Sequence, residues 1–192
     1  GAGSANVKLV KNHSELSRLI NKAFGKGFGR SGRFDRLLNR FWIFQRDKNI
    51  KALFGLFKGF YRSVIPTKLE TFLGKDKGYV YFQAFAPNNE YDTRVIVIGD
   101  RIFAIRRFNR KNDFRASGSG LIDYDHRNIK RELLKYSLVL SETIGSQCIA
   151  CDYIYLNTEF KLVEISYGFA VSAYDKCPGY WDKNLNWHSG EF

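Results

Sequence analysis

Two acidic residues, Asp152 and Glu164, fall on neighbouring strands of a predicted β-hairpin. Asp152 lies in the strand-like run 149–156, Glu164 lies in the run 160–166, and Asn157-Thr158-Glu159 between them is typical of a turn. The hairpin would bring both carboxylates to one end of a sheet. Carboxylate oxygens suit Mg²⁺, which binds through one or two carboxylates together with the phosphates of a substrate. Taken alone, such a pair is more often a solvated sheet edge, because acidic residues are mostly exposed.

Arginines on the preceding strands add groups that bind phosphate. Arg94 opens one predicted strand, Arg107 closes its partner, and Arg115 follows in a polar loop. The planar guanidinium group is the side chain best shaped for phosphate oxygens. The small residues of the opening loop, Gly1 to Asn6, can cradle phosphate through backbone N–H groups. The phosphate loop, the arginines and the acid pair occur in the order expected of a nucleotide-binding site, which the sequence therefore predicts. The alternative is that the arginines are ordinary surface charges.

An α+β fold is needed to position these groups. Strand-like runs rich in β-branched and aromatic residues cover 79–86, 93–99, 101–108, 149–156 and 160–166, and a short one ends at Val10. Apolar residues recur with helical spacing in 13–24 and 128–144. Gly99-Asp100 predicts a tight antiparallel turn, and we expect the chain from Gly168 on to be irregular.

A basic and aromatic block, 33–64, predicts two amphipathic helices in a hairpin, over 34–42 and 50–64. The favoured interpretation packs the apolar stripes on the domain and leaves a basic face in water. Two others stay open. One is a lid or dock for an anionic substrate. The other is a helix pair on a membrane surface, since aromatic residues opposite Lys and Arg are typical of interfacial helices.

The order and spacing of these motifs resemble the ATP-grasp superfamily, of the carboxylate–amine ligase type. The chain is similar to ribosomal-protein glutamate ligases and to D-alanine–D-alanine ligases. The motifs that carry the resemblance are Gln83-Ala84-Phe85-Ala86, Asp92-Thr93-Arg94, Ala104-Ile105-Arg106-Arg107, Asp113-Phe114-Arg115, Ala150-Cys151-Asp152 and Val163-Glu164-Ile165-Ser166. The resemblance implies mostly antiparallel sheets flanked by helices, with the helical hairpin as an insertion.

The resemblance also implies roles for single residues, with ATP and Mg²⁺ as cofactors. Arg94, Arg107 and Arg115 would be the catalytic residues that hold phosphates or an acyl-phosphate. The nucleotide would contact a phosphate loop at Gly1, Gly3, Ser4 and Ala5, the adenine-reading backbone of Gln83, Ala84, Phe85 and Ala86, and Asp92 or Glu90 at the ribose. Asp152, Glu164 and Ser166 would bind metal, although Ser166 stands where the family usually has Asn, a better ligand for Mg²⁺.

The domain organisation follows from the same resemblance. Residues 1–85 would belong to the nucleotide-binding central subdomain, with the hairpin 33–64 inserted, and 86–192 would form the C-terminal ATP-grasp subdomain. The chain has no methionine and starts after the position of the family's nucleotide lysine. We therefore expect a missing N-terminal part of the same protein, and we expect the fragment alone to bind ATP weakly and to be inactive. The segment after Gly168 resembles a branch associated with cell-surface polysaccharide biosynthesis.

Composition narrows the classes of protein to consider. With 44% hydrophobic residues the chain is globular, not disordered, and no apolar run approaches the length of a membrane-spanning helix. The three cysteines are an odd number, and no secretory signal is visible, so we expect a reducing, cytoplasmic environment. Cys148-x-x-Cys151 has no second ligand pair at zinc spacing and predicts buried thiols.

Charge leaves an alternative function open. A net charge of +12, from 31 Lys and Arg against 19 Asp and Glu, favours anionic partners. The alternative is a non-enzymatic basic module that binds nucleic acid or an anionic membrane surface. The acid pair argues against nucleic acid, because carboxylates repel a polyanion, and a membrane surface is less favoured than a ligand site. The expected partners are a nucleotide, a small carboxylate and an amine or similar acceptor.

Overall fold

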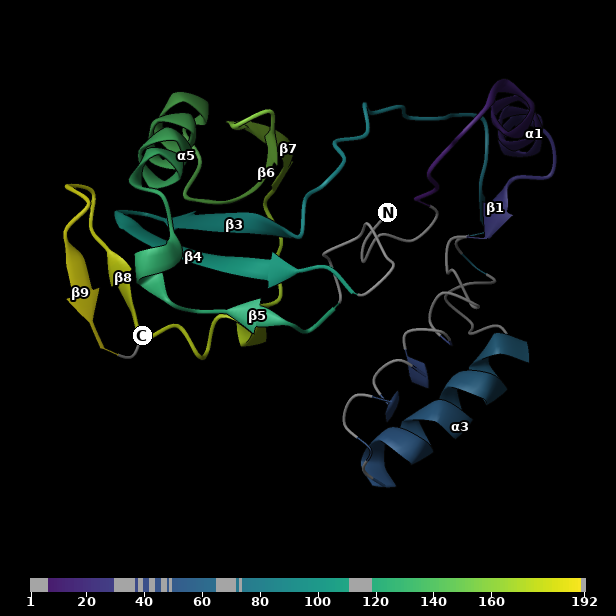
Figure 1. Ribbon diagram of the computed structural model, residues 1–192, viewed down its shortest axis with the longest axis horizontal. Helices are drawn as coiled ribbons and strands as arrows, with labels where there is room; N and C mark the ends of the chain where they lie inside the picture. Colours follow the sequence, from purple (N-terminus) through teal and green to yellow (C-terminus); the bar gives the residue numbers. More distant parts are fainter. Residues whose placement is uncertain are drawn as a thin grey trace. The chain divides into compact units, whose positions relative to one another are not determined.

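The protein has an α+β fold built from two compact units, Gly1–Phe85 and Ala86–Phe192 (Figure 1). The computed structural model describes residues 7–29, 37, 40–41, 44–45, 48, 50–64, 72, 74–110 and 119–190. Within these ranges the chain forms three α-helices and a seven-stranded antiparallel sheet. None of the helices described is long and apolar enough to cross a membrane.

The first unit contains two of the helices and a small two-stranded sheet. α1 (His13–Phe24) begins where the Asn12 side chain accepts a hydrogen bond from the Glu15 N–H at 2.9 Å, which satisfies an amide that the helix itself leaves unpaired. β1 (Phe28–Gly29) pairs with β2 (Lys75–Asp76). α3 covers Ile50–Val64.

The second unit is organised around the large sheet, whose strand order is β7-β6-β3-β4-β8-β9. Its strands are β3 (Tyr91–Ile98), β4 (Arg101–Phe108), β5 (Ile122–Asp123, paired with β4), β6 (Cys148–Leu156), β7 (Glu159–Ser166), β8 (Gly179–Trp181) and β9 (Trp187–Ser189). α5 (Arg131–Ile144) and two 3₁₀ turns, η2 (His126–Asn128) and η3 (Val171–Ala173), connect them.

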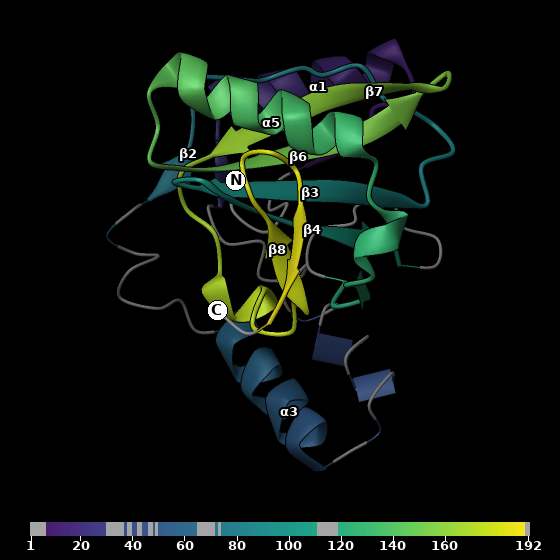
Figure 2. The same cartoon turned by 90° about the vertical axis from the view of Figure 1, so that its left-hand side faces the viewer.

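The two faces of this sheet have different covers. α5 lies across one face (Figure 2), where Leu133 and Leu134 pack on Val95, Ile149 and other buried side chains. The opposite face carries a second apolar cluster around Ile96, Phe103 and Ile105, covered by Tyr174 and Cys177 from the segment that follows β7. Because side chains alternate along a strand, residues two apart share a face. This alternation decides which polar groups meet.

Most of the predicted elements are confirmed to within a few residues. They are the helices 13–24, 50–64 and 128–144, the strands 93–99, 101–108, 149–156 and 160–166, and the turn at Gly99, whose φ is +58°. The predicted helix 34–42 lies mostly outside the described residues. Cys151 is a buried free thiol as predicted, whereas Cys148, predicted to be buried as well, is half-buried. Cys177 is a buried free thiol too.

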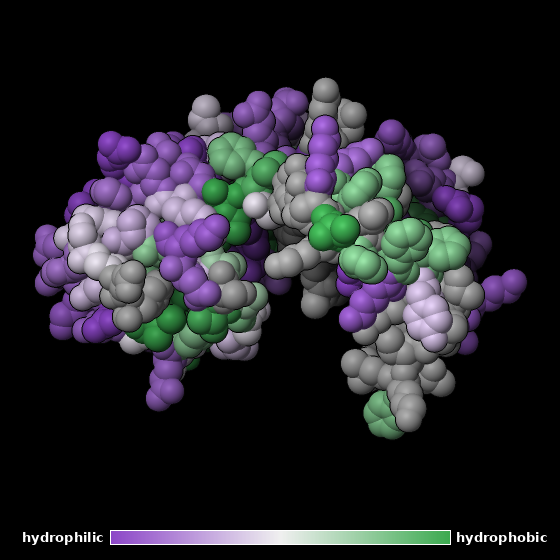
Figure 3. Space-filling model, turned by 90° about the horizontal axis from the view of Figure 1, so that it is seen from below, coloured by the Kyte–Doolittle hydropathy of each residue, from purple (hydrophilic) through white to green (hydrophobic). Residues whose placement is uncertain are grey.

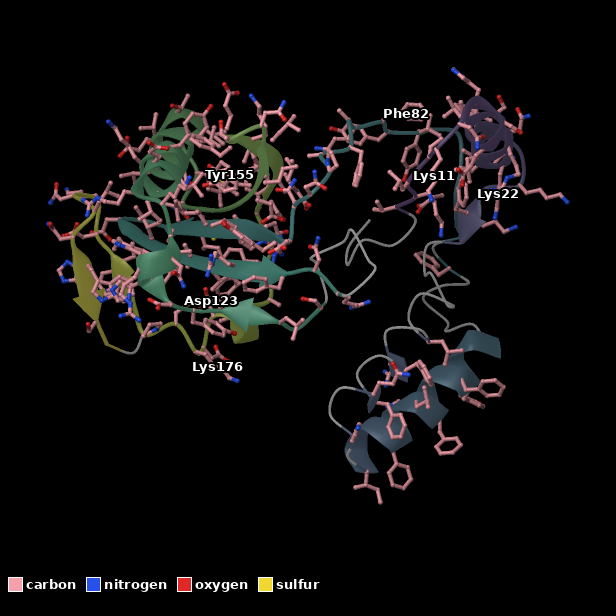
Figure 4. All side chains as sticks on the ribbon, viewed as in Figure 1. Lys11, Lys22, Phe82, Asp123, Tyr155 and Lys176 are labelled. Carbon is pink, nitrogen blue, oxygen red and sulfur yellow. The ribbon has the colours of Figure 1, made fainter. Side chains whose placement is uncertain are left out.

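Three predictions of secondary structure are wrong. Residues 79–86 form no strand, since Tyr79, Tyr81 and Phe82 are 62%, 83% and 59% exposed and pair with no neighbour strand (Phe82 is labelled in Figure 4). Strand preference reflects packing on a neighbour, and without one the aromatic run stays extended coil. The run that ends at Val10 is also coil. The segment after Gly168, expected to be irregular, contains β8 and β9.

Candidate functional site

Four charged side chains meet on the sheet face opposite α5. The β3–β4 register places Asp92 opposite Arg107, and the β3–β6 register places Arg94 opposite Asp152. All four therefore lie on one face, on three adjacent strands, and we call them the Asp–Arg quartet. Its members are Asp92, Arg94, Arg107 and Asp152.

The quartet is joined by paired hydrogen bonds. Arg94 donates from Nε and Nη2 to the two carboxylate oxygens of Asp152, each at 2.5 Å. Arg107 donates from Nε and Nη2 to Asp92 at 2.7 and 2.6 Å. The Nη2 of Arg107 also donates to Asp152 Oδ2 at 2.9 Å, which links the two pairs. Two-pronged contacts of this kind fix the guanidinium planes and are stronger than single hydrogen bonds.

The four charged side chains of the quartet are largely buried, so each charge needs an opposite charge beside it. The side chain of Asp152 is 6% exposed, and those of Arg94 and Arg107 are 15% and 11% exposed. Burial raises the pKa of Asp92 above its ordinary value, against the opposing effect of the Arg107 guanidinium. Burial also disfavours the charge of Arg94, but the Asp152 carboxylate outweighs it and raises the pKa of Arg94. Two acids and two arginines sum to zero charge, which suits a buried cluster.

Tyr174 is a member of this site that the sequence did not indicate. It is buried, its ring packs edge-on against Phe169 at 5.6 Å, and its hydroxyl lies close enough to Arg94 for the two groups to interact electrostatically. Burial raises the pKa of the Tyr174 hydroxyl, so it stays protonated at neutral pH. It comes from the segment after Gly168, where no periodic pattern distinguishes it from the neighbouring aromatic residues.

The predicted metal ligands lie at the edge of the quartet. Glu164 faces Asp152 across the β6–β7 ladder, next to a bulge between Asp152 and Tyr153, and its side chain is exposed. Directly opposite residues in an antiparallel pair are close enough for their side chains to share a ligand. The hydroxyl of Ser166 is instead engaged with the backbone, donating to the Gly168 carbonyl at 2.9 Å.

The carboxylate oxygens of Asp152 and Glu164 suit a magnesium ion only if a bound substrate supplies further oxygen ligands. No group of three or more His, Cys, Asp or Glu side chains able to hold a metal occurs among the residues that the structure describes. Asp152 and Glu164 supply two carboxylates, and Mg²⁺ commonly takes that number with the remaining ligands from phosphates and water. Both oxygens of Asp152 already accept from Arg94 and Arg107, so a metal–nucleotide complex fits here only if these arginines turn toward its phosphates.

The remaining predicted site residues lie apart from the quartet or outside the described residues. Gln83, Ala84 and Phe85 are exposed in extended coil, not in the predicted hinge strand, and Ala86 is partly buried. Glu90 is exposed and accepts a backbone hydrogen bond from Asn109 at 2.8 Å. Gly1, Gly3, Ser4, Ala5 and Arg115 lie outside the described residues.

Arg106, the neighbour of Arg107, points to the other face. Its guanidinium bonds Asp123 on β5 (labelled in Figure 4), with the Nε donating at 2.9 Å, and it stacks 4.8 Å from the Tyr91 ring. The Asp123 carboxylate also accepts from Asn128 Nδ2 and from the Asp125 N–H, each at 2.9 Å. This second pair ties β4 to β5 and to the turn before α5. It gives a control for substitutions in the quartet.

Comparison with known proteins adds no assignment. No protein-family model matches the chain, and no curated protein is significantly similar to it. The function therefore has to be argued from the quartet and its surroundings.

Proposed function

We propose that the protein is the nucleotide- and magnesium-binding part of an ATP-grasp carboxylate–amine ligase. The single observation that supports this most is the placement of Asp152 and Glu164 side by side, with Arg94 and Arg107 on the adjoining strands of the same face. The α+β class with an antiparallel sheet agrees with the ATP-grasp fold. The proposal includes a role in cell-surface polysaccharide biosynthesis.

The quartet gives each residue a role in this proposal. Asp152 and Glu164 would hold a magnesium ion, which on binding neutralises charge on the β- and γ-phosphates of ATP. Arg94 and Arg107 would then turn part of their hydrogen bonding from the carboxylates to phosphate oxygens. Such an exchange keeps every guanidinium paired with an anion, so no buried charge is left alone. Tyr174, whose hydroxyl interacts electrostatically with Arg94, would help to orient this guanidinium.

The proposed reaction has two steps, formation of an acyl-phosphate and its displacement by a nucleophile. A carboxylate oxygen of the substrate attacks the γ-phosphorus of ATP, and ADP leaves with the bond electrons. An amine or similar nucleophile then attacks the carbonyl carbon of the acyl-phosphate, inorganic phosphate leaves, and the nitrogen loses a proton. The protein's contribution is positioning and charge stabilisation, and no covalent bond to the protein is needed.

The experiment that tests the proposal is Mg-dependent ATP binding followed by amide chemical shifts in NMR, which also detects weak complexes. We expect saturable shifts on β3, β4, β6 and β7 that vanish with EDTA and that the substitutions Asp152→Asn and Arg107→Gln weaken about tenfold or more. Arg106→Gln, one residue away on the other face, is the matched control and should bind normally. The proposal would be refuted if the chemical-shift changes were the same with and without Mg²⁺. It would also be refuted if Arg107→Gln and Arg106→Gln weakened ATP binding equally.

A further inference from the structure

The helix α3 carries an exposed apolar stripe that the proposed site does not use. Ile50, Phe54, Phe57 and Tyr61 are 70%, 70%, 66% and 63% exposed. Their spacing of i, i+4, i+7 and i+11 confines them to about 60° of the helix circumference at 3.6 residues per turn. Ring side chains project from α3 along its length in Figure 4, and apolar side chains (green) gather on the surface of this unit in Figure 3. The stripe is therefore exposed within its own unit.

The side of α3 that does pack is a different one. The Arg40 guanidinium donates to the Gly55 carbonyl at 2.8 Å and its side chain runs over Gly59, which is buried. A β-carbon at Gly55 would lie 3.1 Å from Arg40 Nη1, so the two glycines make room for this arginine. Gly55 and Gly59 lie on the far side of the helix from the apolar stripe. The stripe therefore faces away from the Arg40 side of the helix.

Basic residues border the stripe on the same helix. Positions 51, 58 and 62 are Lys, Lys and Arg, at spacing i, i+7 and i+11, and the helix contains no acidic residue. Lys58 is exposed. At 3.6 residues per turn these three positions fall within about 40° of one another, next to the apolar stripe.

The combination of the two lines decides which partner fits. A nucleic acid would satisfy the cations but leave four large apolar side chains in water. A second copy of the helix would cover the apolar stripe but bring two basic lines together. A lipid surface with anionic headgroups satisfies both, because aromatic and aliphatic side chains enter the acyl boundary while Lys and Arg meet the phosphates.

We propose that α3 lies in the plane of an anionic membrane surface and attaches the protein to it peripherally. The helix enters through its apolar stripe of Ile50, Phe54, Phe57 and Tyr61. At fifteen residues it is too short to cross a bilayer, which needs about 20. This inference is independent of the proposed ligase function, whose test is ATP binding.

Vesicle co-sedimentation with the full chain tests the attachment. We expect binding to phosphatidylcholine vesicles that contain phosphatidylglycerol, little binding to pure phosphatidylcholine, and weakening by salt. Phe54→Ser with Phe57→Ser should lower the affinity about tenfold or more, since each phenylalanine loses its place in the acyl region. The matched control is Val139→Ser with Ile144→Ser, two residues 52% and 44% exposed on α5, and should leave binding unchanged.

A fluorescent reporter locates the helix directly. Tryptophan in place of Phe57 should shift its emission to the blue on vesicle addition and be quenched by brominated acyl chains, whereas tryptophan at position 139 should do neither. Circular dichroism of each variant separates loss of the helix from loss of binding. No binding to anionic vesicles by the folded protein would overturn the proposal. So would equal losses in the two double variants, or apolar residues that matter only for self-association or for nucleic-acid binding.

Discussion

At the scale of single residues, the Asp152 carboxylate is the point where the quartet is most vulnerable. It accepts from both Arg94 and Arg107, and its side chain is 6% exposed. Asp152→Asn would leave two buried guanidinium groups with one carboxylate, and breaking a buried pair costs about 3 kcal/mol of unfolding free energy. Urea denaturation followed by circular dichroism measures it.

The control for this substitution lies on the other face. Asp123→Asn removes the partner of Arg106, and both side chains are about one fifth exposed, at 21% and 19%. We expect Asp123→Asn to lower the unfolding free energy by about 1 kcal/mol, because water screens this ion pair and replaces part of its hydrogen bonding. Similar losses for the two variants would contradict the view that the quartet is a buried unit.

A second residue-scale prediction concerns Asp182 in the β8–β9 turn. The pKa of Asp182 is lowered to about 2, first by its hydrogen bond with His188 at 3.0 Å and second by the hydrogen bond that its carboxylate accepts from the Asn186 N–H. Since the folded pKa lies below the ordinary value of about 3.9, this contribution is complete above that value and is lost as pH falls through about 2. We expect the hairpin to loosen between about pH 4 and pH 2. The indole N–H of Trp187 in NMR spectra reports it, and Asp182→Asn should flatten the response.

Part of the site could be predicted at this scale. The residue types and strand positions indicated Arg94, Arg107 and Asp152 as phosphate and metal ligands, and the structure brings these three side chains into contact. Tyr174 could not be found, since it reaches Arg94 from a segment without periodicity. The sequence also did not indicate that the arginines bond the two aspartates, because pairing depends on register between strands distant in the chain.

At the scale of elements, the sequence pattern predicted two hairpins and the helices α1, α3 and α5 correctly. It failed for the run 79–86 and for the short strands β8 and β9. The β3–β4 and β6–β7 hairpins have alternating or apolar runs joined by short turns, and both were predicted. The run 79–86 has the same composition yet stays coil, because no neighbouring strand pairs with it in the described structure. β8 and β9 are three residues each, too short for periodicity to show.

The end of α5 offers a test of an element-scale signal. Gly145 caps the helix at φ +67°, a left-handed conformation that glycine adopts without strain. Gly145→Ala should lower the unfolding free energy by about 1 kcal/mol in chemical denaturation. Gly168→Ala is the matched control, since an added β-carbon meets nothing within 4 Å at either glycine and only Gly145 has a positive φ. An equal loss at Gly168 would show that the penalty at Gly145 does not come from its positive φ.

At the scale of the whole molecule, the apolar core is divided very unequally between the two units. Among the described residues, the buried hydrophobic side chains all belong to Ala86–Phe192, apart from Ala23. Burial of apolar surface is the main stabilising term in folding, at about 25 cal/mol per Å². Conformational entropy of similar size opposes it, and the described residues of Gly1–Phe85 bury little apolar surface to offset that cost.

We therefore expect the two units to behave differently when expressed alone. Residues 86–192 should unfold in one cooperative thermal transition, with near-ultraviolet circular dichroism from the packed Trp181 and Trp187, whose rings lie 4.7 Å apart. Residues 1–85 should show helical far-ultraviolet signal without a cooperative transition, and anionic vesicles should increase that signal if α3 binds them. A cooperative transition in 1–85, or none in 86–192, would mean that the core is not divided in this way. The quartet lies wholly within 86–192, so Asp152→Asn should cost this piece as much unfolding free energy as it costs the full chain.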